Sequence, residues 1–310
     1  MVSNAPFPDE PVSRALLGGA IDYAGLFPPA SLPLSDVLTR YLDYRASEDG
    51  WALGRLVVPA ERLEELAAMV RAEGVKPSRQ IAMGPQGPRG SNHVPIAALI
   101  GADTRDDIQA VDRFNREQRV ACVQTIEVKT GSASEALAVV DELPAGWAGY
   151  LEVPAGAAGD PVLDVVAARG FRAKVRTGGT QPDAFPDPDA LTRFLLAVEE
   201  RGVPFKATAG LHHPLRGSFP LTYSEDAPTG TMYGYLNLAL AALLAWSGRA
   251  APAIRSALLE SDRSALRIED ASLVWKDETF PWEILHTMRL EFFHGFGSCS
   301  FREPLEEWPL

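Results

Sequence analysis

The feature that most constrains the fold is an alternation, between residues 20 and 214, of short apolar runs and longer amphipathic ones. Short apolar runs are typical of buried strands, and amphipathic runs are typical of the helices that connect parallel strands. Seven strands are expected here, at 20–26, 56–59, 80–83 or 97–100, 121–128, 149–153, 172–175 and 204–207. The helices expected between them cover 34–46, 60–73, 105–119, 132–143, 161–169 and 188–201.

Repeated units of this kind, with strands roughly 25 to 35 residues apart, predict an α/β fold with a parallel sheet. An eighth strand at 295–300 would complete a (β/α)8 TIM barrel, although an open doubly wound sheet has the same local pattern. We expect the barrel, with residues 1–310 forming a single domain. An enlarged helical insertion is expected at about 215–290, between strands 7 and 8. Its predicted elements are helices at 232–248, 252–259 and 282–294 and a short strand at 265–268 or 272–275.

Composition limits the partners of this chain. A net charge of -12 argues against nucleic acid and anionic membranes, because phosphate groups attract a surplus of Lys and Arg. The apolar stretch 235–246 is about half of the ~20 residues that span a bilayer, so it predicts a buried helix or an oligomer interface. The first residues lack the segments of a secretory signal, and Cys122 and Cys299 give no disulfide framework. We therefore expect a cytoplasmic protein that needs no cofactor.

Two lysines occupy matching contexts, Lys174 in FRAKVRTGG and Lys206 in PFKATAGLHH. Each lysine lies on a short apolar stretch, and a glycine turn follows that stretch. Lysine is rare in this chain, where it accounts for five of the 29 basic residues. Chance is one explanation of the pairing. The other is an amine nucleophile whose pKa is lowered by a second ammonium, as in lysines that form Schiff bases.

Other polar residues fall where barrel strands should end, which is where barrels place their catalytic groups. Because strand side chains alternate, Lys174 should share a face with Arg176, and Lys206 with Thr208. Charges collected inside a barrel must be paired or must shift their pKa values. The network could be purely structural, or it could perform acid/base work. Its expected members are Asp22, Glu127, Glu152, Lys174, Arg176, Lys206, Thr208, His212 and His213.

Five stretches carry a resemblance to a known family. They are IDYAGLFP at 21–28, YLEV at 150–153, KVRTG at 174–178, FKATAG at 205–210 and FGSCS at 296–300. In this order they resemble motifs of the deoxyribose-phosphate aldolase family of class I aldolases. The resemblance covers the predicted barrel but not residues 215–290.

The resemblance implies a Schiff-base-forming lyase or aldolase that acts on a small anionic, phosphorylated or carboxylated, carbonyl compound. By it, Lys174 would form the imine and Lys206 would lower the pKa of Lys174, with Glu127, Glu152 and Asp22 as further catalytic residues. The chain departs from the family in three places, one of which is that His212 and His213 have no role in the family pattern. Glu127 is the nearest candidate for a proton-shuttling aspartate, and Arg176 replaces a small hydroxyl residue, which favours a carboxylate substrate. The expected substrate and anion contacts are Arg176, Thr177, Gly178, Gly179, Thr208, Gly210, His212, His213, Ser298 and Ser300.

Two alternatives stay open. The first is a metal-dependent lyase, isomerase or hydrolase that uses His212 or His213 with Glu152 and Glu127 as ligands. The second is a barrel without catalysis that binds a partner or assembles as a homo-oligomer through the apolar stretch 232–246. A nucleophilic hydrolase at 298–300 has little support, because no His/Asp signature lies next to Ser298, Cys299 and Ser300 in the sequence.

Overall fold

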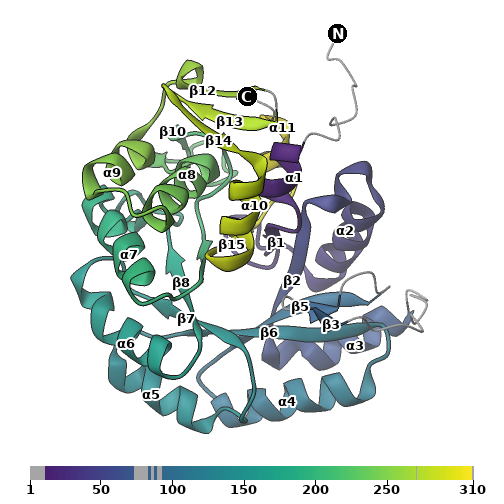
Figure 1. Ribbon diagram of the computed structural model, residues 1–310. Coiled ribbons are helices and arrows are strands. Elements are labelled where there is room, and N and C mark those ends of the chain that lie inside the picture. The colour runs from purple at the N-terminus through teal and green to yellow at the C-terminus, as the bar shows by residue number, and fades with distance from the viewer. Residues whose placement is uncertain (1–10, 73–82, 85–86, 89–92, 270, 309–310) are drawn as a thin grey trace.

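The computed structural model describes residues 11–72, 83–84, 87–88, 93–269 and 271–308, and within them it forms a closed eight-stranded barrel (Figure 1). Every pair of neighbouring barrel strands is parallel. The prediction of a (β/α)8 barrel is therefore confirmed. The order around the barrel is β1 (Ile21–Tyr23), β2 (Leu53–Pro59), β5 (Val94–Ile100), β6 (Ala121–Lys129), β7 (Gly149–Val153), β8 (Arg172–Arg176), β9 (Phe205–Thr208) and β15 (Phe293–Ser298).

Helices surround the strands, as Figure 1 shows. Side-chain caps begin three of them: Asp103, Ser132 and Asp187 each accept a hydrogen bond from a backbone N–H of the first turn. Gly170 and Gly202 follow helix ends with φ of 69° and 61°, the left-handed conformation that glycine adopts without strain. The helices are α2 (Leu34–Ala46), α3 (Leu63–Ala72), α4 (Thr104–Glu117), α5 (Ala133–Glu142), α6 (Asp160–Ala168) and α7 (Pro188–Glu200).

Strand boundaries differ from the predictions at several ends; β2 and β5, for example, each begin three residues earlier than expected. Strand β1 ends at Tyr23, because residues 24–27 form a turn in which the Phe27 N–H donates to the Ala24 carbonyl. The third barrel strand is β5 and not 80–83; residues 80–82 lie outside the described residues, while β3 (Met83–Gly84) pairs with β4 (Gly87–Pro88). Strand β15 starts at Phe293 and ends at Ser298, two residues earlier at each end than expected.

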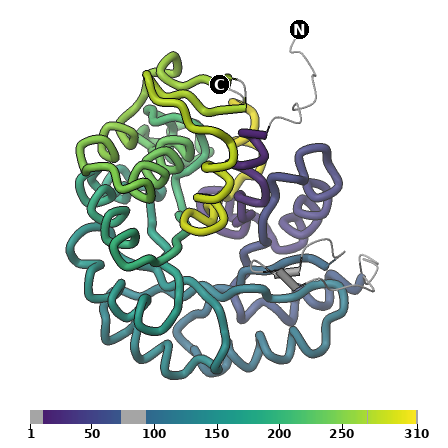
Figure 2. Tube along the Cα trace, in the orientation of Figure 1, coloured from purple at the N-terminus to yellow at the C-terminus, as the bar shows by residue number. Residues whose placement is uncertain are grey.

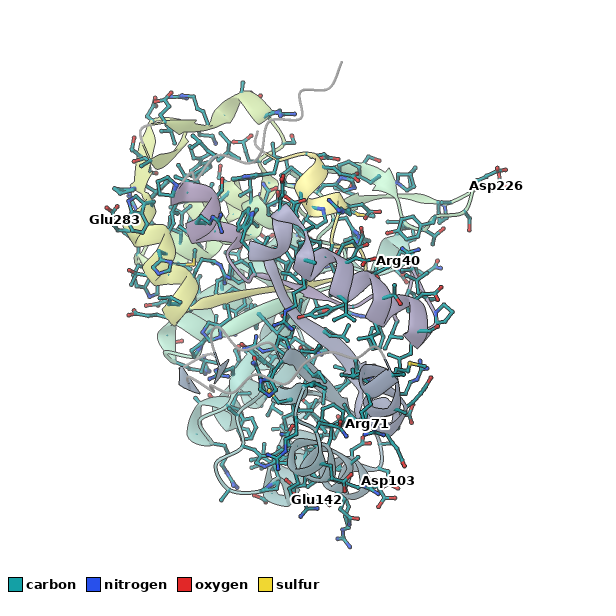
Figure 3. All side chains as sticks on the ribbon, turned by 90° about the vertical axis from the view of Figure 1, so that its right-hand side faces the viewer. Arg40, Arg71, Asp103, Glu142, Asp226 and Glu283 are labelled. Carbon is teal, nitrogen blue, oxygen red and sulfur yellow. The ribbon has the colours of Figure 1, made fainter. Side chains whose placement is uncertain are left out.

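The connection from β9 to β15 is only partly helical. It contains three helices, α8 (Tyr235–Trp246), α9 (Ala251–Leu259) and α10 (Trp282–Glu291). It also contains a hairpin of β10 (Gly217–Pro220) and β11 (Thr229–Met232), whose tip projects from the body near Asp226 (Figure 3). A three-stranded antiparallel sheet of β12 (Leu266–Glu269), β13 (Ser272–Trp275) and β14 (Glu278–Pro281) lies between α9 and α10 along the chain. The expected helices are present, and the expected strand at 265–268 or 272–275 corresponds to β12 or β13. The expectation of a helical insertion was incomplete because it lacked β14 and the β10–β11 hairpin, short antiparallel strands that leave weak sequence patterns.

Helix α8 explains the most apolar stretch of the chain. Every residue from Tyr235 to Ala245 is buried within this single chain, where α8 packs against α7, α9, α10 and β15. Its apolar composition is thus accounted for by intramolecular packing, and it requires no oligomer contact. None of the described helices combines the length and apolar character that a bilayer crossing needs.

The two ends of the described chain meet on one side of the barrel. Helix α1 (Pro11–Leu17) packs against α10, and the purple and yellow segments lie together in Figure 2. The Trp308 indole N–H donates to the Ser13 hydroxyl at 2.9 Å. The short helix α11 (Glu303–Glu306) follows β15 and lies at the edge of the cavity described next.

Candidate active site

A cavity of about 920 Å³ opens at the carboxyl ends of the barrel strands. This is the end where the loops after the strands build the active sites of (β/α)8 enzymes. Side chains along a strand point alternately to its two faces, so residues two apart on one strand both face the cavity. The charged and polar wall residues from the strands are Glu127, Lys129, Glu152, Lys174, Arg176, Lys206 and Thr208.

Strand register brings the lysine cluster together. Glu152 is the lateral partner of Lys174, and Lys174 is the lateral partner of Lys206. Three neighbouring strands therefore present charged side chains at one level of the barrel. Lys174 and Lys206 are therefore neighbours across adjacent strands of the barrel.

One carboxylate joins the two amines. The Nζ of Lys174 lies 3.1 Å from Oε2 of Glu127 and 3.0 Å from Oε2 of Glu152. The Nζ of Lys206 donates to Oε1 of Glu127 at 2.7 Å and also to Oδ2 of Asp22. Glu127 thus accepts from both lysines, one through each of its oxygens. All of these side chains are buried except that of Glu152, which keeps 17% of its surface exposed.

Asp22 is the second carboxylate that binds the Lys206 ammonium. Its Oδ1 accepts the Arg55 backbone N–H at 2.6 Å, while its Oδ2 accepts from Lys206. Position 54 must be glycine for this contact, because a Cβ there would lie 2.3 Å from the Asp22 Oδ1. Asp22 itself is buried beneath the cavity floor. Its place in the structure is that of an anchor for the Lys206 ammonium.

The electrostatics of the cluster follow from its pairing. Burial alone would raise the pKa of Glu127, but the charges of Lys206 and Lys174 outweigh it and lower that pKa to about 2. Burial alone would lower the pKa of Lys206, but Asp22 and Glu127 outweigh it and raise that pKa. At neutral pH, Glu127 is therefore an anion and Lys206 a cation. Lys206 supplies a fixed positive charge, but a carboxylate lies between it and Lys174.

Tyr150 is a member of this cluster that sequence reasoning missed. Its buried ring lies 5.5 Å from the Lys206 Nζ, a cation–π contact, and its hydroxyl donates to Nδ1 of His294 at 2.8 Å. Burial and the nearby Arg172 and Arg289 lower the pKa of His294 to about 3, so the ring is neutral and can accept. The tyrosine was visible in the YLEV stretch, but its neighbour at 294 is 144 positions away.

The predicted anion contacts divide into two groups. Arg176, Gly179, Thr208 and Gly210 line the cavity, and Arg176 is exposed. Thr177 and Gly178 lie behind this wall, where the segment after β8 packs against the segment after β9. The Thr177 hydroxyl donates to the Ala209 carbonyl at 2.7 Å, and a Cβ at Gly178 would meet the Gly210 Cα at 3.0 Å.

On the last strand the alternation places different residues in the cavity from those expected. Gly297 and Cys299 are on the wall. Ser298 is buried, and its hydroxyl accepts the Ser300 N–H at 3.3 Å, while the Ser300 hydroxyl accepts the Glu303 N–H at 3.2 Å. The two serines thus shape the turn into α11, and the cavity receives the thiol between them.

The adjacent histidines take separate partners. His212 Nδ1 lies 2.6 Å from Oε2 of Glu303, and His213 Nδ1 lies 2.8 Å from Oε1 of Glu307. His213 also stacks on Phe219 at 3.5 Å between ring centroids. Glu152 instead pairs with Lys174. Across the described residues, no three His, Cys, Asp or Glu side chains converge as metal ligands, so the set proposed for a metal site does not form there.

Comparison with protein-family models, with curated proteins and with solved structures gave no match. The resemblance to the deoxyribose-phosphate aldolase family therefore depends on the five sequence motifs, and it stays a prediction. The barrel itself is established by its strand topology. Function must be argued from the side chains of the site, since this fold supports many chemistries.

Proposed function

We propose that this protein is a Schiff-base-forming lyase or aldolase that acts on a small anionic carbonyl compound. The observation that carries the proposal is the placement of the Lys174 amine on the cavity wall, between the carboxylates of Glu127 and Glu152. A buried lysine that faces an open cavity at the carboxyl ends of barrel strands has the position that carbonyl chemistry requires.

The three carboxylates have different tasks in this proposal. Asp22 and Glu127 fix Lys206 as an ammonium, and Glu127 also orients the Lys174 amine. Glu152 is the more exposed carboxylate, and its Oε2 is 3.0 Å from the Lys174 Nζ. Transfer of a proton from Lys174 to Glu152 leaves a free amine, which adds to the substrate carbonyl carbon. Glu152 then returns this proton to the oxygen of the adduct and relays a second proton from the adduct nitrogen to the same oxygen. Water leaves, and the protonated imine forms.

The Arg176 guanidinium on the cavity wall favours a substrate with a negative charge. Arg176 lies two residues after Lys174 on the same strand face, and it makes no salt bridge within the part of the chain that the structure describes. A guanidinium binds a carboxylate or phosphate through two parallel hydrogen bonds. An anionic group held there would place a nearby carbonyl carbon next to the Lys174 amine.

Borohydride trapping tests the proposal. The protein is incubated with small aldehydes and 2-keto acids, reduced, digested and analysed by mass spectrometry. We expect the adduct on Lys174, with loss of trapping in Lys174→Met. Lys129→Met is the matched control, because Lys129 lies on the same cavity wall but is exposed. A signal of equal size in Lys174→Met would remove this lysine from the mechanism and leave the ion-pair network with a structural role.

A further inference from the structure

A second group of reactive side chains lies in the same cavity, away from the lysines. Cys299 directly follows β15, His212 lies in the loop after β9, and Glu303 begins α11. All three line the cavity, and they come from two segments of the chain, because Cys299 and Glu303 are four residues apart. No part of the proposed lysine chemistry uses them.

Their side chains are arranged in a row, from the Glu303 carboxylate through the His212 ring to the Cys299 thiol. Glu303 Oε2 is 2.6 Å from His212 Nδ1, and His212 Nε2 is 3.8 Å from Cys299 Sγ. The carboxylate therefore orients the ring and fixes the tautomer that presents Nε2 to the sulfur. This is the arrangement of a nucleophile, a base and an orienting group that defines a catalytic triad irrespective of fold. A hydroxyl completes the group, since Tyr223 Oη lies 3.7 Å from the same sulfur.

We propose that Cys299, His212 and Glu303 form a second covalent centre in this cavity, at which the Cys299 thiolate adds reversibly to the carbonyl carbon of a small aldehyde. The geometry alone assigns the nucleophile. The choice of an aldehyde rests on the proposed lyase function, because cleavage by Lys174 would release a carbonyl compound into the cavity that both centres share.

The charge state of the histidine places a proton beside the sulfur. Burial alone would lower the pKa of His212, but its hydrogen bonds to Cys299 and Glu303 outweigh it and raise that pKa to about 9. The ring is thus an imidazolium at neutral pH, and its Nε2 carries the proton that faces the Cys299 sulfur. Glu303 carries the balancing charge, because His212 holds its pKa below the ordinary value even though burial opposes this.

The step balances without a further reactant. The sulfur lone pair forms the C–S bond, and the carbonyl π pair moves onto the oxygen. That oxygen takes the proton from His212 Nε2, which gives a hemithioacetal and a neutral ring. Tyr223 can donate to the forming alkoxide, since burial and then the charge on Cys299 raise its pKa and keep it protonated. Reversal of the same proton transfer releases the aldehyde.

The first experiment measures the reactivity of the thiol. Cys122→Ser is the background for all variants, which leaves Cys299 as the single cysteine of the chain. Alkylation by iodoacetamide at neutral pH is followed by intact mass in the folded protein, in His212→Asn, in Glu303→Gln and in urea-unfolded protein. We expect folded Cys299 to react roughly tenfold faster than the unfolded thiol and than His212→Asn, with Glu303→Gln in between. Cys299→Ser gives the blank.

The unfolded reference keeps this test decisive if a variant fails to fold. A folded rate at or below the unfolded rate overturns the assignment of an activated nucleophile. Equal rates in folded parent and folded His212→Asn overturn the role of the histidine. Rates in Glu303→Gln that match the parent overturn the orienting role of the carboxylate.

The second experiment tests the aldehyde, with glycolaldehyde as the probe. It is performed in Lys174→Met, so that no imine at that lysine can obstruct the thiol. We expect glycolaldehyde to slow alkylation of Cys299 and dialysis to restore the rate. An unchanged rate overturns the aldehyde assignment. The two proposals fail separately, because loss of borohydride trapping at Lys174 leaves the Cys299 alkylation rate unaffected.

Discussion

At the residue scale, the cluster around Glu127 shows how a buried charge is made tolerable. An isolated buried carboxylate would cost several kcal/mol and would bind a proton. Glu127 instead accepts hydrogen bonds from two ammonium groups, one on each oxygen. The residue that the sequence marked as a possible proton shuttle is therefore a fixed anion, and the partly exposed Glu152 is better placed to move protons.

This pairing predicts the acid sensitivity of the fold. The folded pKa of Glu127 is about 2 against an ordinary value of 4.5, so its contribution to stability is complete above pH 4.5 and is lost as the pH falls toward 2. We expect the free energy of unfolding, measured by urea titration, to fall through this window. Glu127→Gln should lower stability at pH 7 by about 3–5 kcal/mol, since it leaves each of two buried ammonium groups with one carboxylate instead of two, and should flatten the acid dependence.

The control for this measurement is Glu142→Gln. Glu142 is exposed at the end of α5, as Figure 3 shows, and its replacement should change stability by no more than about 0.5 kcal/mol. If Glu127→Gln kept the acid dependence of the parent, other carboxylates would be responsible for it.

At the element scale, one asparagine fastens the most apolar helix to its surroundings. Asn237 is fully buried in α8, and its amide donates to the carbonyls of Ala257 at 2.7 Å and Glu260 at 2.8 Å. Its Oδ1 accepts the Arg216 N–H at 2.7 Å. The side chain thus joins α8 to the end of α9 and to the start of the β10–β11 hairpin.

Removing this amide leaves three backbone groups without their partner. We expect Asn237→Ala to lower the free energy of unfolding by several kcal/mol, since each buried unsatisfied group costs roughly 1–3 kcal/mol. Urea unfolding measures the total. Hydrogen exchange should show reduced protection first around 257–260, where two of the three hydrogen bonds end. Uniform loss of protection across the barrel would instead mean that Asn237 supports the fold as a whole.

At the scale of the whole molecule, the barrel closes between its first and last strands. Gly295 lies on this seam with φ of 131°, and a Cβ there would lie 2.3 Å from the Ala20 carbonyl oxygen. The Phe296 N–H next to it donates to that same oxygen at 2.8 Å. A side chain at position 295 would therefore separate β15 from β1.

We expect Gly295→Ala to lower the thermal midpoint markedly, because it adds a steric clash to the strain of a positive φ. Gly248→Ala is the matched control: Gly248 also has a positive φ, of 72°, but a Cβ there meets nothing within 4 Å. The control should cost about 1–2 kcal/mol from backbone strain alone. Equal losses in the two variants would show that the seam tolerates the added atom. Calorimetry measures both.

The barrel could be predicted from the sequence because the signals for it are local. Each βα unit carries its own apolar pattern, its own helix cap and a glycine that ends the helix. The sequence predicted the lysine pair for the same reason, since both lysines stand at matching positions of successive units. In the connection from β9 to β15 it predicted the helices α8, α9 and α10 and a strand at the position of β12 or β13. It missed β14 and the hairpin of β10 and β11, and it misplaced the ends of β1 and β15.

By itself, then, the chain determined the fold class and which side chains reach the carboxyl ends of the strands. Tertiary structure alone decided which of them touch. The carboxylate between Lys174 and Lys206, and the line from Glu303 through His212 to Cys299, join residues tens of positions apart. Such contacts depend on strand register and on how the loops pack over the barrel, and neither quantity is encoded in any single segment.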